Sequence, residues 1–274
     1  MIEPRRGVLP SGVVWRRWEP PGRVRGVVLL VHGLAEHGGR YQPLAEHLAG
    51  LDLAVLAPDH RGHGDSPGAR AHICDFQAFL DPLSQLREII ATDYPGLPCF
   101  LLGHSLGGLI AAVYLLETRQ PFTGVVLSAP ALAIPDAPPA WLLALNRCLS
   151  RVLPRLRTVR LDAGLVSRDP QVVADYRADP RVHHGRLTVR LVAEMFAAMA
   201  RVRAEAARLT QPLLILHGEA DGLTDPAGSR DLAARVGSDD VSLRLYPGLY
   251  HEVFNEPERA QVLADLDHWL LPRC

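Results

Sequence analysis

Ser105 lies at the centre of the pentapeptide Gly103-His-Ser-Leu-Gly107. The apolar run at residues 99–102 predicts a buried strand before it, and residues 109–116 predict a helix after it. Strand, Gly-x-Ser-x-Gly and helix in this order predict a nucleophile elbow, a tight turn that presents the serine Oγ at a helix N-terminus. Gly103 and Gly107 are expected because any Cβ there would collide with the neighbouring strand or helix. The chemistry predicted is nucleophilic attack by a serine hydroxyl.

A serine hydroxyl is a weak nucleophile until a base takes its proton and an acid orients that base. Around such an elbow the chain order is serine, acid, histidine, with each residue in a loop after a strand. Asp221 and Asp225 follow the predicted strand at residues 212–217. Asp225 directly precedes Pro226, which is typical of a helix N-cap. We therefore predict that Asp221 is the acid.

His251 is the predicted base. It lies in a loop after the last predicted strand, residues 241–246, and before a helix expected to begin at Pro257. Two other histidines compete for this role. His268 falls on the closing helix and His217 ends a strand, so both are interpreted as structural.

Two backbone N–H groups are predicted to stabilise the oxyanion that forms on the substrate carbonyl. One belongs to Leu106, the residue after the serine. The other belongs to Leu34, in the loop after an early strand, where Gly33 permits close approach. Both leucines would act through the backbone alone. His104 flanks the serine and is interpreted as orienting the turn.

The chain has 274 residues, of which 48% are hydrophobic, enough for one large domain or for one domain with an insertion. A hairpin is predicted at residues 7–18. Beyond it, predicted strands alternate with helices, which favours a mostly parallel sheet with helices on both faces. The strands are expected at 26–31, 53–57, 99–102, 124–128, 212–217 and 241–246, and the helices at 42–48, 76–92, 109–116, after Pro226 and at 257–271.

This alternation stops between residues 129 and 211, where helical segments are separated by prolines and no strand is expected. We therefore predict one α/β core made of residues 1–128 and 212–274. Residues 129–211 are predicted to form a helical cap inserted into that core.

Composition narrows the classes of function. No apolar stretch of about 18 residues predicts a membrane span, and the N-terminal residues lack the apolar centre of a secretory signal, so a cytoplasmic location is expected. The net charge of −1 gives no reason to expect nucleic acid. The four cysteines lack metal or redox spacing. We expect no metal, no cofactor and no disulfide.

Five motifs together resemble the monoacylglycerol lipase family of α/β-hydrolases, especially its bacterial members. They are Val31-His-Gly-Leu-Ala-Glu-His-Gly-Gly-Arg-Tyr41, Asp59-His-Arg-Gly-His-Gly-Asp-Ser66, Gly103-His-Ser-Leu-Gly107, His217-Gly-Glu-Ala-Asp221 and Tyr250-His-Glu-Val-Phe-Asn-Glu256. Their order and spacing follow the family. The resemblance implies an α/β-hydrolase fold, a Ser105–Asp221–His251 triad, an oxyanion hole from Leu34 and Leu106, and monoacylglycerols as substrates.

Residues 141–157 of the predicted cap form an amphipathic pattern on a helical wheel. One face carries Trp141, Leu145, Leu149, Val152 and Leu153, and another carries Arg147, Arg151 and Arg155. Two interpretations are open: the helix lies on an anionic lipid surface, or its apolar face packs on the core while the arginines are solvated. A second amphipathic stretch, residues 187–209, is expected to complete the lid. Glu36 and Arg40 either contact a substrate hydroxyl or order the loop after the first buried strand.

The expected reaction is hydrolysis of an ester that joins one medium or long acyl chain to a small polar alcohol, as in a monoacylglycerol. The alternatives are a lysophospholipase, a broad carboxylesterase, an aminopeptidase and a receptor that binds its ligand without turnover. An aminopeptidase would need cap carboxylates that converge on a free amine. Ser105 itself argues against epoxide hydrolases and haloalkane dehalogenases, which place an aspartate at the elbow.

Overall fold

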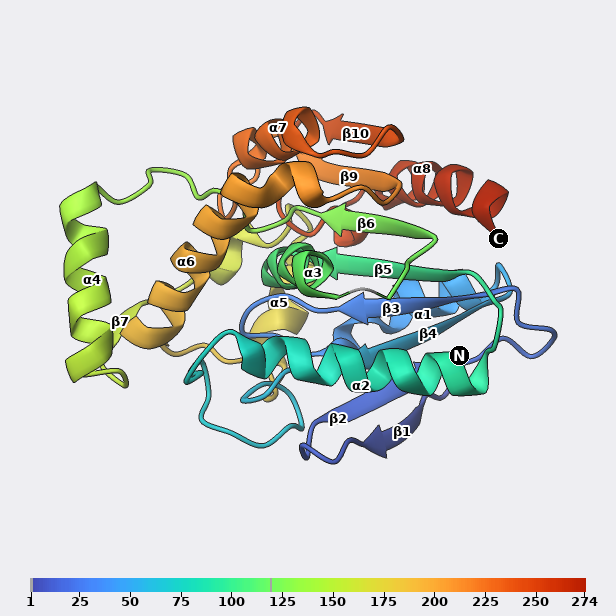
Figure 1. The fold of residues 1–274 in the computed structure, drawn as a ribbon, viewed down its shortest axis with the longest axis horizontal. Coiled ribbons are helices and arrows are strands. Elements are labelled where there is room, and N and C mark those ends of the chain that lie inside the picture. The colour runs from blue at the N-terminus through green and yellow to red at the C-terminus, as the bar shows by residue number, and fades with distance from the viewer. Residues whose placement is uncertain (1, 119) are drawn as a thin grey trace.

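The computed structural model describes residues 2–118 and 120–274. Its centre is an eight-stranded sheet in the order β1-β2-β4-β3-β5-β6-β9-β10 (Figure 1). The first pairs, β1 with β2 and β2 with β4, are antiparallel, and the remaining pairs are parallel. The predicted α/β architecture is therefore confirmed. The strands are β1 (Arg5–Val8), β2 (Val14–Trp18), β3 (Gly26–Val31), β4 (Leu53–Pro58), β5 (Cys99–His104), β6 (Gly124–Ser128), β9 (Leu213–Gly218) and β10 (Val241–Tyr246).

Two apolar layers cover the two faces of the sheet. In β3, Val27, Leu29 and Val31 pack into one layer, whereas Val28 and Leu30 pack into the other. This alternation follows from the period of two along a strand, and a strand buried on both faces must be apolar throughout. The first layer also contains α2 (Gln77–Asp93), α3 (Leu106–Glu117) and α7 (Pro226–Arg235), and the second contains α1 (Gln42–Ala49) and α8 (Arg259–Leu270).

Neighbouring strands β6 and β9 pair directly, yet a long insertion separates them in the sequence. The insertion comprises α4 (Ala140–Val152), β7 (Arg157–Val159), η2 (Ala163–Leu165), α5 (Pro170–Ala178), β8 (Leu187–Thr188), α6 (Val189–Glu205) and η3 (Ala206–Arg208). Figure 1 shows α6 between the sheet and α4, which stands at the end of the molecule. Helix α4 packs against α6.

Two expectations for this insertion were wrong. Strands β7 and β8 pair as a small antiparallel sheet, although no strand was expected. They are three and two residues long, too short to show a period of two. Helix α4 also ends earlier than predicted, at Val152, because Pro154 cannot continue a helix. Arg155 therefore lies outside the helix and does not extend its basic face.

Four loops meet at one edge of the sheet, because the parallel strands that precede them all point the same way. They follow β3, β5, β9 and β10 and carry Leu34, Ser105, Asp221 and His251. In open parallel sheets this carboxyl-end edge is where ligands bind. The topology therefore gathers residues that lie more than 200 positions apart in the chain.

Candidate active site

Ser105 occupies a strained turn between β5 and α3. Its φ of 54° and ψ of −121° lie in a region that side chains rarely adopt, at a cost of about 1–3 kcal/mol. The Ser105 carbonyl accepts N–H groups from Gly108, Leu109 and Ala131, and its own N–H donates to the Ser128 carbonyl at 2.9 Å. These bonds hold the turn against its strain.

Glycine is required on both sides of Ser105 for a steric reason. A Cβ on Gly103 would overlap the carbonyl oxygen of Gly107, and a Cβ on Gly107 would overlap the carbonyl oxygen of Val31. Both obstacles are backbone atoms, which cannot rotate away as a side chain can. The close packing of α3 on β3 and β5 therefore explains the Gly-x-Ser-x-Gly pattern.

Asp221 and His251 are joined by a hydrogen bond of 2.7 Å from His251 Nδ1 to Asp221 Oδ2. Both side chains are buried. Oδ1 accepts the N–H groups of Leu223 and Thr224 at 2.7 and 3.0 Å, and Oδ2 also accepts the Thr224 hydroxyl at 2.7 Å. No described residue hydrogen-bonds to His251 Nε2, which leaves this nitrogen available to the pocket.

The charges of this pair shift both pKa values in opposite directions. Burial alone would raise the pKa of Asp221, but the neighbouring His251 and the hydrogen bonds to the carboxylate bring it well below its ordinary value. Burial alone would lower the pKa of His251, but the Asp221 carboxylate raises it above the ordinary value of about 6.5. Asp221 is therefore an anion that favours a proton on His251.

The backbone amides of Leu34 and Leu106 face no acceptor. Neither N–H makes a hydrogen bond with any part of the chain that the structure describes. Both residues are buried, and buried amides of globular proteins are almost always paired. Leu106 N–H is at the first residue of α3, where the helix dipole adds partial positive charge. The two unpaired amides are suited to donate hydrogen bonds to a negatively charged oxygen.

A cavity of about 620 Å³ opens above these groups and is lined mainly by apolar side chains of the insertion. At its floor lie Ser105, Leu34 and His251, and its walls come from α4, α6 and the β7 segment. The wall residues include Leu142, Leu145, Leu149, Val159, Val192, Met195, Phe196 and Met199. Such a volume fits a ligand with a long apolar chain.

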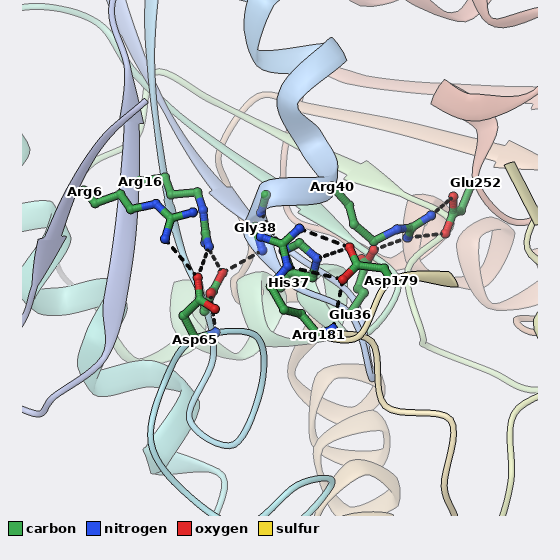
Figure 2. Close-up of polar contacts among 12 residues, drawn as sticks. Arg6, Arg16, Glu36, His37, Gly38, Arg40, Asp65, Asp179, Arg181 and Glu252 are labelled. Carbon is green, nitrogen blue, oxygen red and sulfur yellow. Dashed lines mark hydrogen bonds and ion pairs between the residues drawn. The ribbon is translucent and has the colours of Figure 1, made fainter. Parts of the chain in front are cut away.

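One arginine joins the loop after β3 to the loop after β10 (Figure 2). Arg40 donates to both oxygens of Glu252, at 2.7 and 2.9 Å, and also to Glu36. Glu36 in turn accepts the Gly33 N–H at 2.6 Å and the Tyr41 hydroxyl at 2.7 Å. Both carboxylates border the cavity. Of the two roles left open for Glu36 and Arg40, these contacts favour loop ordering.

Other predicted roles can be compared with the contacts. Asp225 caps α7, with its side chain accepting the Ala227 N–H at 2.8 Å. His217 approaches the Asp221 carboxylate at 3.1 Å, so it orders the acid loop. The ring of His104 packs against that of His251 in a tilted arrangement, with centroids 4.7 Å apart, and hydrogen-bonds to the Ser128 hydroxyl. Burial lowers the pKa of His104 to about 3, so it is neutral.

Thr224 is a site residue that sequence reasoning missed. Its hydroxyl and its N–H both bind Asp221, and the hydroxyl lies 3.3 Å from His251 Nδ1. Its place three residues after the acid was a usable signal, because Asp and its neighbours often bond within one turn. Within residues 2–118 and 120–274, no three or more His, Cys, Asp or Glu side chains are arranged to hold a metal ion.

The sheet order, the strand–serine–helix elbow and the Asp–His pair are those of serine hydrolases with the α/β-hydrolase fold. The family model described as serine aminopeptidase, S33, matches residues 22–258. The chain is 45% identical to the monoacylglycerol lipase of Mycolicibacterium smegmatis, over 97% of this chain and 95% of that protein. It is 38% identical to the monoglyceride lipase of Homo sapiens, over 94% of this chain and 86% of that protein.

The crystal structure of Paleococcus ferrophilus monoacylglycerol lipase has the same fold, with a TM-score of 0.87 at 37% identity, covering 96% of this chain and 99% of that one. The protein belongs to the monoacylglycerol lipase family of α/β-hydrolases. The resemblance inferred from the five motifs is confirmed.

Proposed function

We propose that this protein hydrolyses monoacylglycerols to a free fatty acid and glycerol. The observation that carries the proposal is that His251, paired with Asp221, lies beside Ser105 in the lining of a cavity of about 620 Å³ with mainly apolar walls. The family supports the same substrate class, because the relatives named above are monoacylglycerol and monoglyceride lipases.

In the proposed reaction, Ser105 Oγ attacks the ester carbonyl carbon and its proton passes to His251 Nε2. The Leu34 and Leu106 amides stabilise the oxyanion, and Asp221 stabilises the imidazolium. The carbon–oxygen bond to glycerol then breaks, and His251 returns the proton to the leaving oxygen. Water attacks the acyl-enzyme by the same route in reverse, which releases the fatty acid and regenerates Ser105.

The charge distribution at the floor argues against an aminopeptidase. A free substrate amine would need an unpaired carboxylate near Ser105. Glu36 and Glu252 both line the cavity, and both are bound to Arg40. The third carboxylate on the cavity lining, Asp162, caps η2 through the Gly164 N–H. An ester with an uncharged alcohol fits this arrangement better.

We further propose that residues 129–211 act as a cap that takes substrate directly from a lipid surface. Among the described residues, seven of the eight exposed large hydrophobic side chains lie at residues 141–159, including Trp141 and Val152 with exposed fractions of 68% and 77%. Leu142, Leu145 and Val159 are both exposed and part of the cavity lining. An acyl chain leaving the lipid layer would therefore meet a continuous apolar path.

Charge supports an anionic surface as the partner. Residues 129–211 contain 13 arginines and 7 acidic residues, a net charge of +6, whereas the rest of the chain has 16 arginines and 23 acidic residues, a net charge of −7. This asymmetry would turn the cap toward anionic lipid and the core away from it. The structure describes no helix long and apolar enough to cross a bilayer. We propose peripheral docking from the cytoplasm.

Vesicle binding tests the docking surface. Trp141→Ser combined with Val152→Ser should weaken co-sedimentation with phosphatidylglycerol vesicles at least fivefold, since neither side chain lines the cavity and hydrolysis of a short soluble ester should stay unchanged. Val8→Ser is the matched control, because Val8 is 67% exposed on edge strand β1. Equal binding by the double variant and the parent would refute the docking proposal.

Hydrolysis itself is tested by kcat/KM for 1- and 2-monoacylglycerols of about 8 to 18 carbons, beside matched lysophosphatidylcholine and diacylglycerol. Ser105→Ala is the control and should abolish turnover, with kcat in the parent on the usual scale of about 1–1000 per second. Faster turnover of lysophosphatidylcholine would make the protein a lysophospholipase with the same mechanism. Absence of turnover on every substrate would refute the proposal and favour a ligand receptor.

A further inference from the structure

We propose that Asp179, in the turn after α5, is a positioning residue that holds the loop of residues 32–37, here called the oxyanion loop, in its reactive shape through His37. The inference rests on the proposed function, in which the Leu34 N–H of this loop stabilises the oxyanion. It concerns a residue of the insertion that lies 142 positions from its partner in the sequence.

The contact between the two residues has a defined direction. His37 is fully buried, and its Nε2 lies 2.8 Å from Asp179 Oδ2 (Figure 2). The other ring nitrogen, Nδ1, accepts the Gly39 N–H at 3.1 Å. The proton of a neutral ring must therefore be on Nε2, which donates it to Asp179. Burial lowers the pKa of His37, which keeps the ring in this neutral form.

A second contact from the same turn holds the oxyanion loop on the other side of Glu36. The His183 N–H donates to the Ala35 carbonyl at 2.7 Å. Ala35 has a φ of 67°, a left-handed conformation that costs a residue with a Cβ about 1 kcal/mol or more. Such strain persists only where neighbouring groups fix the backbone. The two contacts bracket the segment that directly follows the Leu34 N–H.

A chain of hydrogen bonds connects His37 to the Gly33–Leu34 end of the oxyanion loop. His37 caps η1 (Gly38–Tyr41), the turn that carries Arg40 and Tyr41. These two side chains both bind Glu36, and Glu36 accepts the Gly33 N–H next to Leu34. A shift of His37 would therefore change where the Leu34 amide points. An amide displaced by about 1 Å loses much of its effect on a transition state.

A purely structural role for Asp179 is the rival explanation, and the contacts allow the two to be separated. Asp179 Oδ1 accepts the Arg181 N–H at 2.9 Å, which orders the turn, and the Arg181 guanidinium contacts both carboxylate oxygens at 3.2 Å. Arg181→Ala removes the guanidinium but keeps the backbone N–H and the bond to His37. It is therefore the matched control.

Asp179→Asn is the test variant, because it keeps the size of the side chain. If its amide oxygen still accepts the Arg181 N–H, the NH₂ group faces the Nε2–H of His37, and two donors oppose each other. We expect kcat for a soluble acyl ester to fall about 10- to 100-fold, less than the loss of about 100- to 1000-fold for removing an oxyanion donor outright. KM should change less than about threefold, and Arg181→Ala should stay within about twofold of the parent in both constants.

A pair of inhibitors separates positioning from folding. An alkyl trifluoromethyl ketone forms a tetrahedral oxyanion on the serine, whereas a monoalkyl glycerol ether only fills the cavity. In Asp179→Asn the ketone should bind more weakly by the same factor as the fall in kcat/KM, and the ether should bind as it does to the parent. Active-site titration with a fluorophosphonate corrects for unfolded protein. Asp179→Glu, which shifts the carboxylate by one methylene, takes its place if the asparagine variant does not fold.

The inhibitor and kinetic results can support or overturn the positioning role of Asp179. Selective weakening of the ketone in the Asp179 variant supports the inference. Equal weakening of ketone and ether, an unchanged kcat, or the same loss in Arg181→Ala overturns it. Full turnover by Ser105→Ala would instead contradict the proposed function, so the two failures are distinguishable.

Discussion

Arg40→Met should destabilise the protein strongly at neutral pH, because Arg40 binds two buried carboxylates, those of Glu36 and Glu252. The side chains of Glu36 and Glu252 are each 4% exposed, and that of Arg40 is 12% exposed. Methionine removes the charge but keeps the apolar stem. The variant therefore leaves Glu36 and Glu252 facing each other without a counter-charge.

Removing one partner of a buried ion pair costs about 3–5 kcal/mol. We expect this loss in the free energy of unfolding at pH 8, or about 6–10 °C in melting temperature for a chain of this size. In the parent, burial would raise the pKa of Glu252, but Arg40 brings it below its ordinary value. Without Arg40, burial dominates and the pKa rises. The folded variant then gains a proton as the pH falls, so its deficit should shrink between pH 8 and pH 5.

Urea-induced unfolding of the parent and the variant at both pH values measures this difference. Arg40→Lys is the matched control: it keeps the charge, loses the two-pronged contact with Glu252 and should cost less. Adding Glu252→Gln to Arg40→Met should restore at least about 1 kcal/mol, because one unpaired charge is removed. A deficit below about 1 kcal/mol at pH 8, or one equal at pH 5 and pH 8, would refute the reasoning.

Three further predictions concern the elbow, the base and the buried histidines. Gly107→Ala should lower the unfolding free energy by more than about 3 kcal/mol, seen in thermal melts, because its Cβ would overlap the Val31 carbonyl oxygen; a parent-like melt would contradict this. The kcat/KM for a soluble ester should rise with pH through a pKa above about 6.5, since neutral His251 is the proposed base and its pKa is raised; a limb centred below pH 6 would count against it. Burial lowers the pKa of His60 to about 3 and that of His63 to about 4. Below about pH 6.5 the unfolded chain therefore binds more protons than the folded chain, and each ring should lower the free energy of unfolding by about 2 kcal/mol at pH 5. Urea midpoints that are equal at pH 7 and pH 5 would exclude this effect.

The sequence predicted those parts of the fold and site that depend on local patterns. The buried strands are continuous apolar runs, and the Gly-x-Ser-x-Gly turn has a steric requirement that only glycine meets. Pro226 is a local signal that marks Asp225 as the N-cap of α7, and this left Asp221 as the predicted acid. The end of α4 was also predictable from Pro154, but the helical wheel was drawn through this proline to residue 157.

Long-range polar contacts leave no such pattern. Arg40 and Glu252 are 212 residues apart, and His37 and Asp179 are 142 residues apart. No period or spacing relates such residues, and only the packing of the insertion on the carboxyl-end edge of the sheet brings the second pair together. The sequence therefore predicted which residues could react, but not which residues hold them in place.

The direct pairing of β6 with β9 has a consequence for how this scaffold can diversify. About 84 residues leave the sheet after Ser128 and return at Leu213, one strand further along. Closing a flexible loop costs about 0.6 kcal/mol for each doubling of its length. Exchanging this excursion for one of about 10 residues would therefore alter the closure term by only about 2 kcal/mol. Segments of very different size can therefore be exchanged between the same two strands, so new cavities can evolve over an unchanged Ser105 turn.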